Sequence, residues 1–528
     1  ISTLNISRDG YSTWNTIAVN NAVPIPPVHV TQGDTLVLHV QNKLDTPTSV
    51  HAHGIYHKST DYYDGAEMVT ECGIPPGENF TYIIETGSQV GNFWIHAHVH
   101  SQYTDGFRTP FVIHEKVMPD TYDEEVLLYF EDWDERSFLD KMARDSELAL
   151  ADVPTAYRTL LINGVNGNKT HTIKFSKGKR YRLRLMSLST AFWVKFRIHG
   201  HRMSVVGKDG VDSQPLEVDG VDLGPGQRYS VIVTTGESDE FNYMFTATLY
   251  ANFVDPYPGL MPRVYNGLVQ YNEDAPTKPV TADDDGNDDY SDERLVWSDA
   301  INMQALDRQP LLPVDTQIVL SIKQYVAEHG IPVYTFGDYA FNYSLVPTLF
   351  TALSMGDLAL NHTTYGPHAQ ARILHLNESV ELLIYNYNAK DHSLHLHMSE
   401  FQVVEVGPYG DAVAHDRKPV KFQRAGPAPM RCDLITVRAY SYIRLRFRVE
   451  RPNVMLFHCH MSHGGYSGLA VTFVAAPDLM QKQIKVPEES LRMCRLQNIK
   501  TSGNAAGNEG LDMTGLYEPF LVNRKSFY

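Results

Sequence analysis

Histidine pairs spaced by two residues constrain this chain more than any other feature. The sequence has 23 histidines in 528 residues, and chance alone would give about one such pair. Six occur, and four stand in dense motifs: His51-Ala52-His53-Gly54, Trp94-Ile95-His96-Ala97-His98, His392-Ser393-Leu394-His395-Leu396-His397 and His458-Cys459-His460. Because residues i and i+2 of a β-strand project to the same face, each pair presents two imidazoles side by side.

The four motifs predict a metal cluster rather than scattered histidines. Any one pair, taken alone, is more simply an ordinary surface or core histidine. Two early and two late pairs together would bring eight nitrogens to the place where the first and last parts of the chain meet. Imidazole clusters suit copper, zinc or iron, and no carboxylate-rich shell accompanies them that would favour magnesium or calcium.

Cys459 lies between two of these histidines and indicates the chemistry. By strand alternation its side chain points away from His458 and His460, into the core of its own domain. A thiolate there, with His392 and one further imidazole, makes the ligand set of a blue-copper electron-transfer site. An electron arriving at the sulfur would have a short covalent route to the cluster.

Charge and hydropathy limit the partners. Lys and Arg total 45 against 62 Asp and Glu, a net charge of −17, which argues against nucleic acid or an anionic membrane. No apolar run reaches the roughly 18 residues that a membrane span needs. The chain begins at Ile1 with no Met and no apolar leader, so a soluble, mature form is expected.

The strand pattern predicts an all-β protein of about three domains. Short β-rich runs between Gly, Pro and Asn recur along the chain, which indicates β-sandwiches throughout. Helical patterns are few, namely 134–146 and 477–483. The expected organisation is a first domain at 1–117, a second at 118–282, a linker at 283–293, a third domain at 294–479 and a tail at 480–528. The linker carries seven acids, and we interpret it as solvated chain rather than a cation-holding loop.

Six acceptor sequons favour a secreted or cell-wall glycoprotein. Each is an asparagine followed two residues later by Ser or Thr: Asn5, Asn79, Asn168, Asn342, Asn361 and Asn377. Such triplets also arise by chance in cytosolic proteins. Only four cysteines occur, too few for a disulfide-built scaffold.

With these motifs the chain resembles the multicopper oxidases, specifically the three-domain fungal laccase and ferroxidase branch. The resemblance runs from about Ile25 to Leu469 and includes Asp64-Gly65, the run 74–77, the run 102–106 and the run 161–164. It implies three cupredoxin-like Greek-key β-sandwiches and four copper ions. These would be one type 1 copper in the third domain and, between the first and third domains, one type 2 copper and a type 3 pair.

The resemblance also implies a role for each site residue. The type 2 copper would be bound by His51 and His395, and the type 1 copper by His392, Cys459 and a second imidazole. The type 3 pair would be bound by His53, His96, His98, His397, His458 and His460. Asp64 matches the carboxylate beside the cluster and would help deliver protons. Cys72 matches a half-cystine that is joined to the C-terminal region, which implies a bridge from Cys72 to Cys494.

The chain departs from the family pattern near the type 1 site. The second imidazole falls one place early, at His463, and we predict that it still binds because Gly464 and Gly465 allow the loop to re-route. Leu469 takes the axial position. The carboxylate that laccases carry would fall near Ala191, and the Glu that iron oxidases use aligns with His199. We expect substrate to pack against an exposed His392, with His199 as its hydrogen-bond partner or base, although His199 could equally be a turn histidine.

The predicted function is a laccase-like oxidase. It would take single electrons from a phenol or aromatic amine and reduce dioxygen to water. The alternative is a ferroxidase that oxidises Fe(II), and a third possibility is a non-catalytic copper-binding protein, which a copper count per chain would separate. A monomer is favoured.

Overall fold

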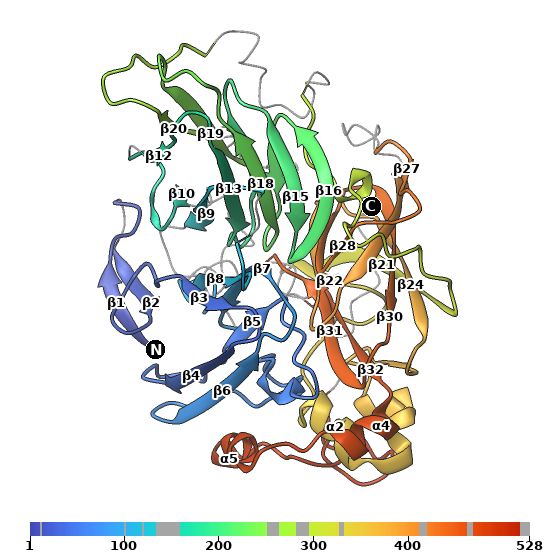
Figure 1. Cartoon of the computed structure of the whole chain (residues 1–528). Coiled ribbons are helices and arrows are strands. Elements are labelled where there is room, and N and C mark those ends of the chain that lie inside the picture. The colour runs from blue at the N-terminus through green and yellow to red at the C-terminus, as the bar shows by residue number, and fades with distance from the viewer. Residues whose placement is uncertain are drawn as a thin grey trace.

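The computed structural model describes residues 1–10, 13–99, 102–118, 121–133, 159–169, 171–250, 263–280, 295–326, 332–410, 420–461 and 468–517. Within these ranges β-strands are the main regular structure, as predicted, and the chain forms three cupredoxin-like units. Figure 1 shows the N-terminal unit in blue, the middle unit in green above it and the C-terminal unit in orange beside both. None of the described helices is long and apolar enough to cross a membrane.

The first unit carries two of the four histidine motifs on neighbouring strands. One sheet has the order β3-β8-β7-β5, with β3 (Val28–Thr31), β8 (Arg108–His114), β7 (Gly91–His96) and β5 (His51–His53). Beside it lie two antiparallel pairs, β4 (Thr35–Gln41) with β6 (Asn79–Glu85) and β1 (Ser2–Ile6) with β2 (Trp14–Ala18). On β6 the apolar residues alternate, so that Phe80, Tyr82 and Ile84 fill the core and their neighbours face outward.

The middle unit is a sandwich of two larger sheets. The first has the order β11-β10-β9-β13-β18-β15-β16, with β11 (Val165–Asn166), β10 (Thr159–Ile162), β9 (Glu124–Trp133), β13 (Arg180–Ser187), β18 (Arg228–Thr234), β15 (Met203–Lys208) and β16 (Val211–Val218). The second has the order β12-β20-β19-β14-β17, with β12 (Thr172–Lys174), β20 (Arg263–Gln270), β19 (Tyr243–Tyr250), β14 (Trp193–Ile198) and β17 (Val221–Leu223). Leu183, Leu185 and Val231 are among the residues buried between them.

The third unit repeats this architecture and carries the other two motifs. Its first sheet contains β22 (Pro332–Thr335), β21 (Thr316–Val326), β24 (Ser379–Asn386), β30 (Ser441–Arg448), β26 (Phe401–Pro408) and β27 (Gln423–Arg424), with β28 (Arg431–Cys432) paired to β26. The other sheet has the order β23-β32-β31-β25-β29, with β23 (Arg372–Leu374), β32 (Ala470–Ala475), β31 (Asn453–Cys459), β25 (His392–Leu396) and β29 (Leu434–Val437). Phe457, Leu445 and Phe473 are part of its core.

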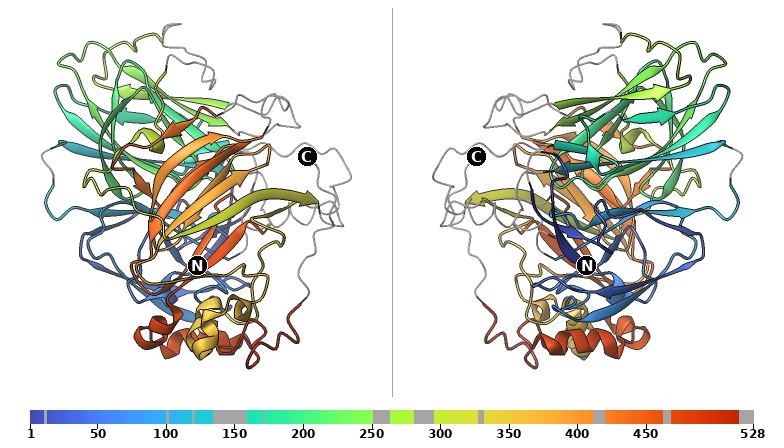
Figure 2. Two further views of the ribbon diagram at one scale, coloured as in Figure 1. Left: turned by 90° about the vertical axis from the view of Figure 1, so that its right-hand side faces the viewer. Right: turned by 90° about the vertical axis from the view of Figure 1, so that its left-hand side faces the viewer.

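The helices are short and gather at one end of the molecule. Both side views place them together below the sheets (Figure 2). They are α2 (Thr348–Ser354), α4 (Pro477–Gln483) and α5 (Glu488–Leu496), with short 3-10 turns at η1 (Asp61–Tyr63), η2 (Ala300–Asn302), η3 (Gly356–Leu360) and η4 (His362–Tyr365). The helix predicted over 477–483 is present with those bounds, and Pro477 stands in its first turn. The helix predicted over 134–146 and the acidic linker lie outside the described residues.

The tail after the third unit packs back against the first. The predicted bridge between Cys72 and Cys494 is present, with both residues buried. Around it, the Gln497 amide donates to the carbonyls of Cys72 and Gly73 at 2.9 and 3.1 Å, and Arg492 pairs with Glu78 at 2.6 Å. The exact domain limits remain predictions, but the contacts of the tail with the first unit are plain.

Removing the bridge should loosen the tail. A disulfide that closes so long a loop contributes about 2–5 kcal/mol, so Cys494→Ser should make trypsin cleavage after Arg495 and Lys500 at least about tenfold faster. The comparison is limited proteolysis of the copper-loaded protein, followed by mass spectrometry. Cys432→Ala, which removes a buried thiol outside the bridge, is the control. Equal cleavage rates in the two variants would mean that other contacts hold the tail.

Candidate copper centre

Two pairs of antiparallel strands place the imidazoles opposite one another. In the first unit β5 pairs with β7 so that His51 stands opposite His96. In the third unit β25 pairs with β31 so that His395 stands opposite His458. Cross-strand neighbours lie close enough for their side chains to meet, so each strand pair offers a compact half of the site.

The two halves meet and form one buried cluster. The rings of His51 and His397 stack with centroids 4.2 Å apart, and those of His53 and His395 stack at 3.7 Å. In each pair one ring comes from the first unit and the other from the third. The structure therefore brings together all eight predicted cluster histidines, which come from chain segments hundreds of residues apart.

The distances between the eight rings allow the division into two triads and a pair that the resemblance implies. His98, His397 and His458 can point one nitrogen each into a common space, with these atoms within 4.8 Å of one another. His53, His96 and His460 form a second triad, with centroids 5.0–5.9 Å apart. His51 and His395 remain, 6.0 Å apart. Two other triads are equally compact, His51 with His395 and His397 and His51 with His53 and His96, so the assignment of single rings to the type 2 and type 3 sets stays a prediction.

On three of these rings a hydrogen bond occupies one nitrogen and leaves the other without a partner in the described contacts. His51 Nδ1 lies 2.6 Å from the Asp64 carbonyl, His96 Nδ1 lies 2.9 Å from the Ala97 carbonyl, and His395 Nδ1 lies 2.9 Å from the Asp433 carbonyl. The second nitrogen of each has no hydrogen-bond partner among the described residues. Buried polar atoms normally have partners, so a row of unpaired nitrogens that face one another fits bound metal ions.

Burial keeps these imidazoles neutral, which is the state that binds a metal. It lowers the pKa of six of them well below the ordinary value, namely His53, His96, His98, His395, His458 and His460, and the neighbouring rings lower each further. A neutral imidazole carries the free lone pair that copper needs.

Asp64 lies where the sequence placed it, against the cluster. His397 Nδ1 donates to its carboxylate at 2.9 Å, and His51 Nδ1 lies 3.3 Å from the other oxygen. Burial alone would raise the pKa of Asp64, but these two imidazoles outweigh it and hold the pKa well below its ordinary value. Gly65 makes this approach possible: its φ is +79°, and a Cβ there would lie 2.1 Å from the Val50 carbonyl oxygen.

The mononuclear site lies on the opposite face of β25 and β31. His392 Nδ1 and Cys459 Sγ face each other 3.6 Å apart, and both are buried in the third unit. Burial raises the pKa of the Cys459 thiol to about 12, so a bound cation is needed to hold the thiolate. Leu469 is buried beside this site, and its carbonyl accepts a hydrogen bond from Cys459 N at 3.0 Å. His463 lies outside the described residues, and its role stays a prediction.

Two expectations about substrate contact need correction. His392 was expected to be exposed, but only 2% of it is accessible, and Tyr334 packs edge-on against its ring at 5.4 Å. A substrate must therefore give its electron through covering residues. His199 follows the last residue of β14. The first residue of that strand, Trp193, is the one near the type 1 site: it donates a hydrogen bond to Thr436 on β29, the strand that pairs with β25. Six residues of strand span about 20 Å, so the structure does not bring His199 to His392.

Two residues in contact with the cluster were not predicted from the sequence, Asp433 directly and Arg228 through it. The carbonyl of Asp433 accepts from His395, and its carboxylate lies 3.3 Å from His53 Nε2. Arg228 forms a two-pronged ion pair with the same carboxylate. For Asp433, the only sequence signal was a single acid directly before the mostly apolar strand Leu434–Val437, which is unusual next to a buried strand.

A thiolate-imidazole site joined through Cys459 to a cluster of eight imidazoles defines a copper-dependent oxidase. Comparisons with known proteins agree. Three multicopper oxidase families match residues 1–117, 124–260 and 344–478. The chain belongs to the multicopper oxidase family, and it accordingly takes four coppers: one type 1, one type 2 and a type 3 pair.

Similar proteins match along nearly the whole chain. The iron multicopper oxidase fer1 of Mycosarcoma maydis is 31% identical, over 97% of this chain and 85% of that protein. The iron transport multicopper oxidase FET3 of Gibberella zeae is 33% identical, over 95% and 80%. Among solved structures, Fet3p, a multicopper oxidase that functions in iron import, superposes with a TM-score of 0.87 at 27% identity, covering 98% and 97%. The laccase from Botrytis aclada gives 0.76 at 25% identity, covering 94% and 90%.

Replacing Cys459 should remove one copper and leave three. In Cys459→Ser the intense blue absorption is lost because the thiolate-copper charge transfer disappears, and copper falls from about four to about three per chain. Cys432→Ala is the control, since Cys432 is buried but touches no predicted ligand in the described hydrogen bonds. The measurement is absorption spectroscopy with elemental copper analysis. A blue Cys459→Ser variant would disprove the assignment of the sulfur.

Replacing Asp64 should impair turnover rather than the blue site. Asp64→Asn keeps the shape but loses the charged acceptor for His397, so oxygen uptake should fall about 10- to 100-fold with the blue absorption intact. Asp61→Asn is the matched control: it is a buried carboxylate in the same segment, and it accepts from Val454 N at 3.0 Å. Unchanged turnover of Asp64→Asn at every pH would contradict a role for Asp64 in proton delivery.

Proposed function

We propose that this multicopper oxidase is a ferroxidase, which oxidises Fe(II) and reduces dioxygen to water. The observation that carries the proposal is a pair of buried aspartates, Asp391 and Asp222, that the partly exposed Arg438 holds together near the start of the strand that carries His392. The relatives named as iron oxidases support it. The laccase reading from the sequence is less well supported, and the non-catalytic alternative is set aside because the chain belongs to an enzyme family.

Asp391 and Asp222 bring carboxylates from two units next to His392. Asp391 precedes His392 in the chain, and Val437 is the cross-strand partner of that histidine. Arg438, next to Val437, holds Asp391 and Asp222 at 3.4 Å each. Asp391 is thus one residue from the type 1 ligand, and Arg438, one residue from its strand partner, joins Asp222 of the middle unit to it. Carboxylate oxygens suit ferrous ion, and the protein's net charge of −17 favours an approaching cation.

The chain's own residues then carry out the steps around the metal sites. The Asp391 and Asp222 carboxylates hold the ferrous ion. Tyr334 and the other residues that bury His392 keep the ion outside the type 1 site. Cys459 links that site covalently to His458 and His460 of the cluster. Asp64 holds His397 and His51 in place and stands ready to pass protons. When bound, the coppers supply the redox chemistry: four ferrous ions give four electrons, and one dioxygen with four protons becomes two waters.

One observation favours an aromatic reductant as the second candidate. Arg438 already pairs with both acids, and a guanidinium there offsets the negative charge that would attract Fe(II). Its side chain is one-third exposed, so it also offers a flat, polar surface to a phenol or aromatic amine.

Oxygen uptake with two reductants separates the candidates. The copper-loaded protein should consume oxygen faster with ferrous iron than with an aminophenol at mildly acidic pH. Asp222→Asn should raise KM for Fe(II) about tenfold, because the cation loses one of two carboxylates, and leave kcat with the aminophenol unchanged. The control with the same charge change is Asp239→Asn, which pairs with the exposed Lys177 in the middle unit. Faster uptake with the aminophenol, and equal effects of both variants on iron, would favour a laccase.

We also propose that the protein is a secreted or cell-wall glycoprotein. Five of the six acceptor asparagines are exposed and Asn361 is half-buried, so a transferase could reach most of them. A shift in mass after removal of N-linked glycans from the native protein would support this.

A further inference from the structure

The middle unit supplies none of the predicted copper ligands, yet one of its arginines reaches the cluster. Arg228 begins β18 and is wholly buried. Its two terminal nitrogens donate to the two carboxylate oxygens of Asp433 at 2.7 and 2.6 Å. Its Nε donates to the Asn92 carbonyl at 2.9 Å, on β7 of the first unit. One guanidinium therefore touches all three units of the chain.

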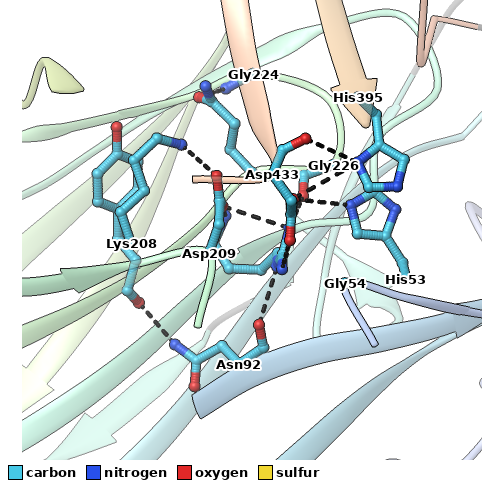
Figure 3. Close-up of polar contacts among 12 residues, drawn as sticks. His53, Gly54, Asn92, Lys208, Asp209, Gly224, Gly226, His395 and Asp433 are labelled. Carbon is cyan, nitrogen blue, oxygen red and sulfur yellow. Dashed lines mark hydrogen bonds and ion pairs between the residues drawn. The ribbon is translucent and has the colours of Figure 1, made fainter. Parts of the chain in front are cut away.

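Asp433 is the acceptor for two cluster imidazoles that come from different units. Its carboxylate lies 3.3 Å from His53 Nε2, and its backbone carbonyl lies 2.9 Å from His395 Nδ1. Figure 3 shows Asp433 between these two stacked rings and Asp209 of the middle unit. An acceptor behind a metal-binding imidazole fixes which nitrogen faces the metal. Here it leaves His53 Nδ1 and His395 Nε2 without partners among the described residues.

The network continues behind Arg228 and is closed to water. Asp209 accepts from Arg228 N at 2.8 Å and pairs with Lys208 at 2.7 Å, and all of these side chains are buried. Removing two ion pairs from water costs so much that apolar residues of similar size are often at least as stabilising. A contribution to stability alone therefore explains this network poorly. A role in fixing the position of the Asp433 carboxylate explains it better.

The backbone is shaped around the arginine. Gly54, which follows His53, has φ of +89°, and a Cβ there would lie 2.7 Å from an Arg228 nitrogen and 2.8 Å from an Asp433 oxygen. Gly226 has φ of +85°, and a Cβ there would lie 2.6 Å from Leu434 and 3.4 Å from the His460 ring. Both glycines allow backbone from two units to close on the ion pair (Figure 3).

We propose that Arg228 is a positioning residue for the copper cluster: it holds the Asp433 carboxylate so that His53 and His395 present the correct nitrogens across the junction of three units. The middle unit would thereby set the alignment of the two halves of the site. A planar fork is needed for this, because a lysine ammonium cannot hold both carboxylate oxygens in one plane. The inference concerns assembly of the cluster and holds whether the reductant is iron or an aromatic compound.

The first test compares Arg228→Lys with Arg184→Lys. Arg184 is a matched control: it is a buried arginine on β13 of the same unit, it pairs with Glu125, and it also bonds to Asn92 at 2.8 Å, but it does not touch Asp433 in the described contacts. Arg228→Lys should weaken binding of the type 2 copper about 10- to 100-fold in a chelator titration and change its electron paramagnetic resonance signal. The blue absorption should persist. Arg184→Lys should keep both signals. Identical affinities and spectra in the two variants would overturn the proposal.

A second variant separates positioning from folding. Arg228→Gln leaves Asp433 charged and unpaired in the interior, so it should lower the melting temperature sharply. Adding Asp433→Asn removes the unpaired charge and should restore much of the melting temperature, while the type 2 signal stays abnormal because the fork is absent. If the double variant recovers both the melting temperature and the signal, the pair serves folding alone and the proposal fails.

Discussion

Two half-sites must be held face to face for this protein to have a cluster at all. β5 and β7 carry one half and β25 and β31 carry the other, and three of the four groups of possible ligands among the described residues combine residues of both halves. The stacked pairs His51 with His397 and His53 with His395 exist only because the first and third units are docked in one register. The bond from His397 to Asp64 and the bond from His53 to Asp433 each cross that junction. Small errors in docking would therefore separate nitrogens that must share one ion, since bond distances to copper tolerate little change.

The two metal sites use opposite faces of the same strands. On β25 and β31, His395 and His458 point to the junction, while His392 and Cys459 point into the core of the third unit. Side chains alternate along a strand, so neighbouring residues necessarily serve different sites. The arrangement keeps the sulfur in an apolar core and the imidazoles at a polar junction, yet only peptide bonds separate them. The strand itself, rather than a mobile element, therefore connects the site that accepts electrons with the cluster that reduces dioxygen.

Much of this could be predicted from local pattern, and the remainder depends on contacts between distant segments. Short stretches of sequence are enough to recognise the i, i+2 histidines, the β-rich runs such as Thr35–Gln41 and the order of the family motifs. Asp433 and Arg228 are single residues, 205 positions apart, and no local pattern links them. His199 was misplaced because alignment to a family position does not tell which end of a strand faces the type 1 site. The helix Glu488–Leu496 was missed although its first turn holds two acids and its last an arginine, because the segment is short and polar.

The bridge between Cys72 and Cys494 makes most of the chain into a covalent ring. The two cysteines are 422 positions apart, so the ring includes the whole middle unit and every cluster ligand except His51 and His53, which precede it on the same chain. A single break of the backbone anywhere inside the ring would leave one connected molecule. The two half-sites would then stay tethered through sulfur even where the peptide chain between them had been cut, and the tether would keep the halves at high local concentration.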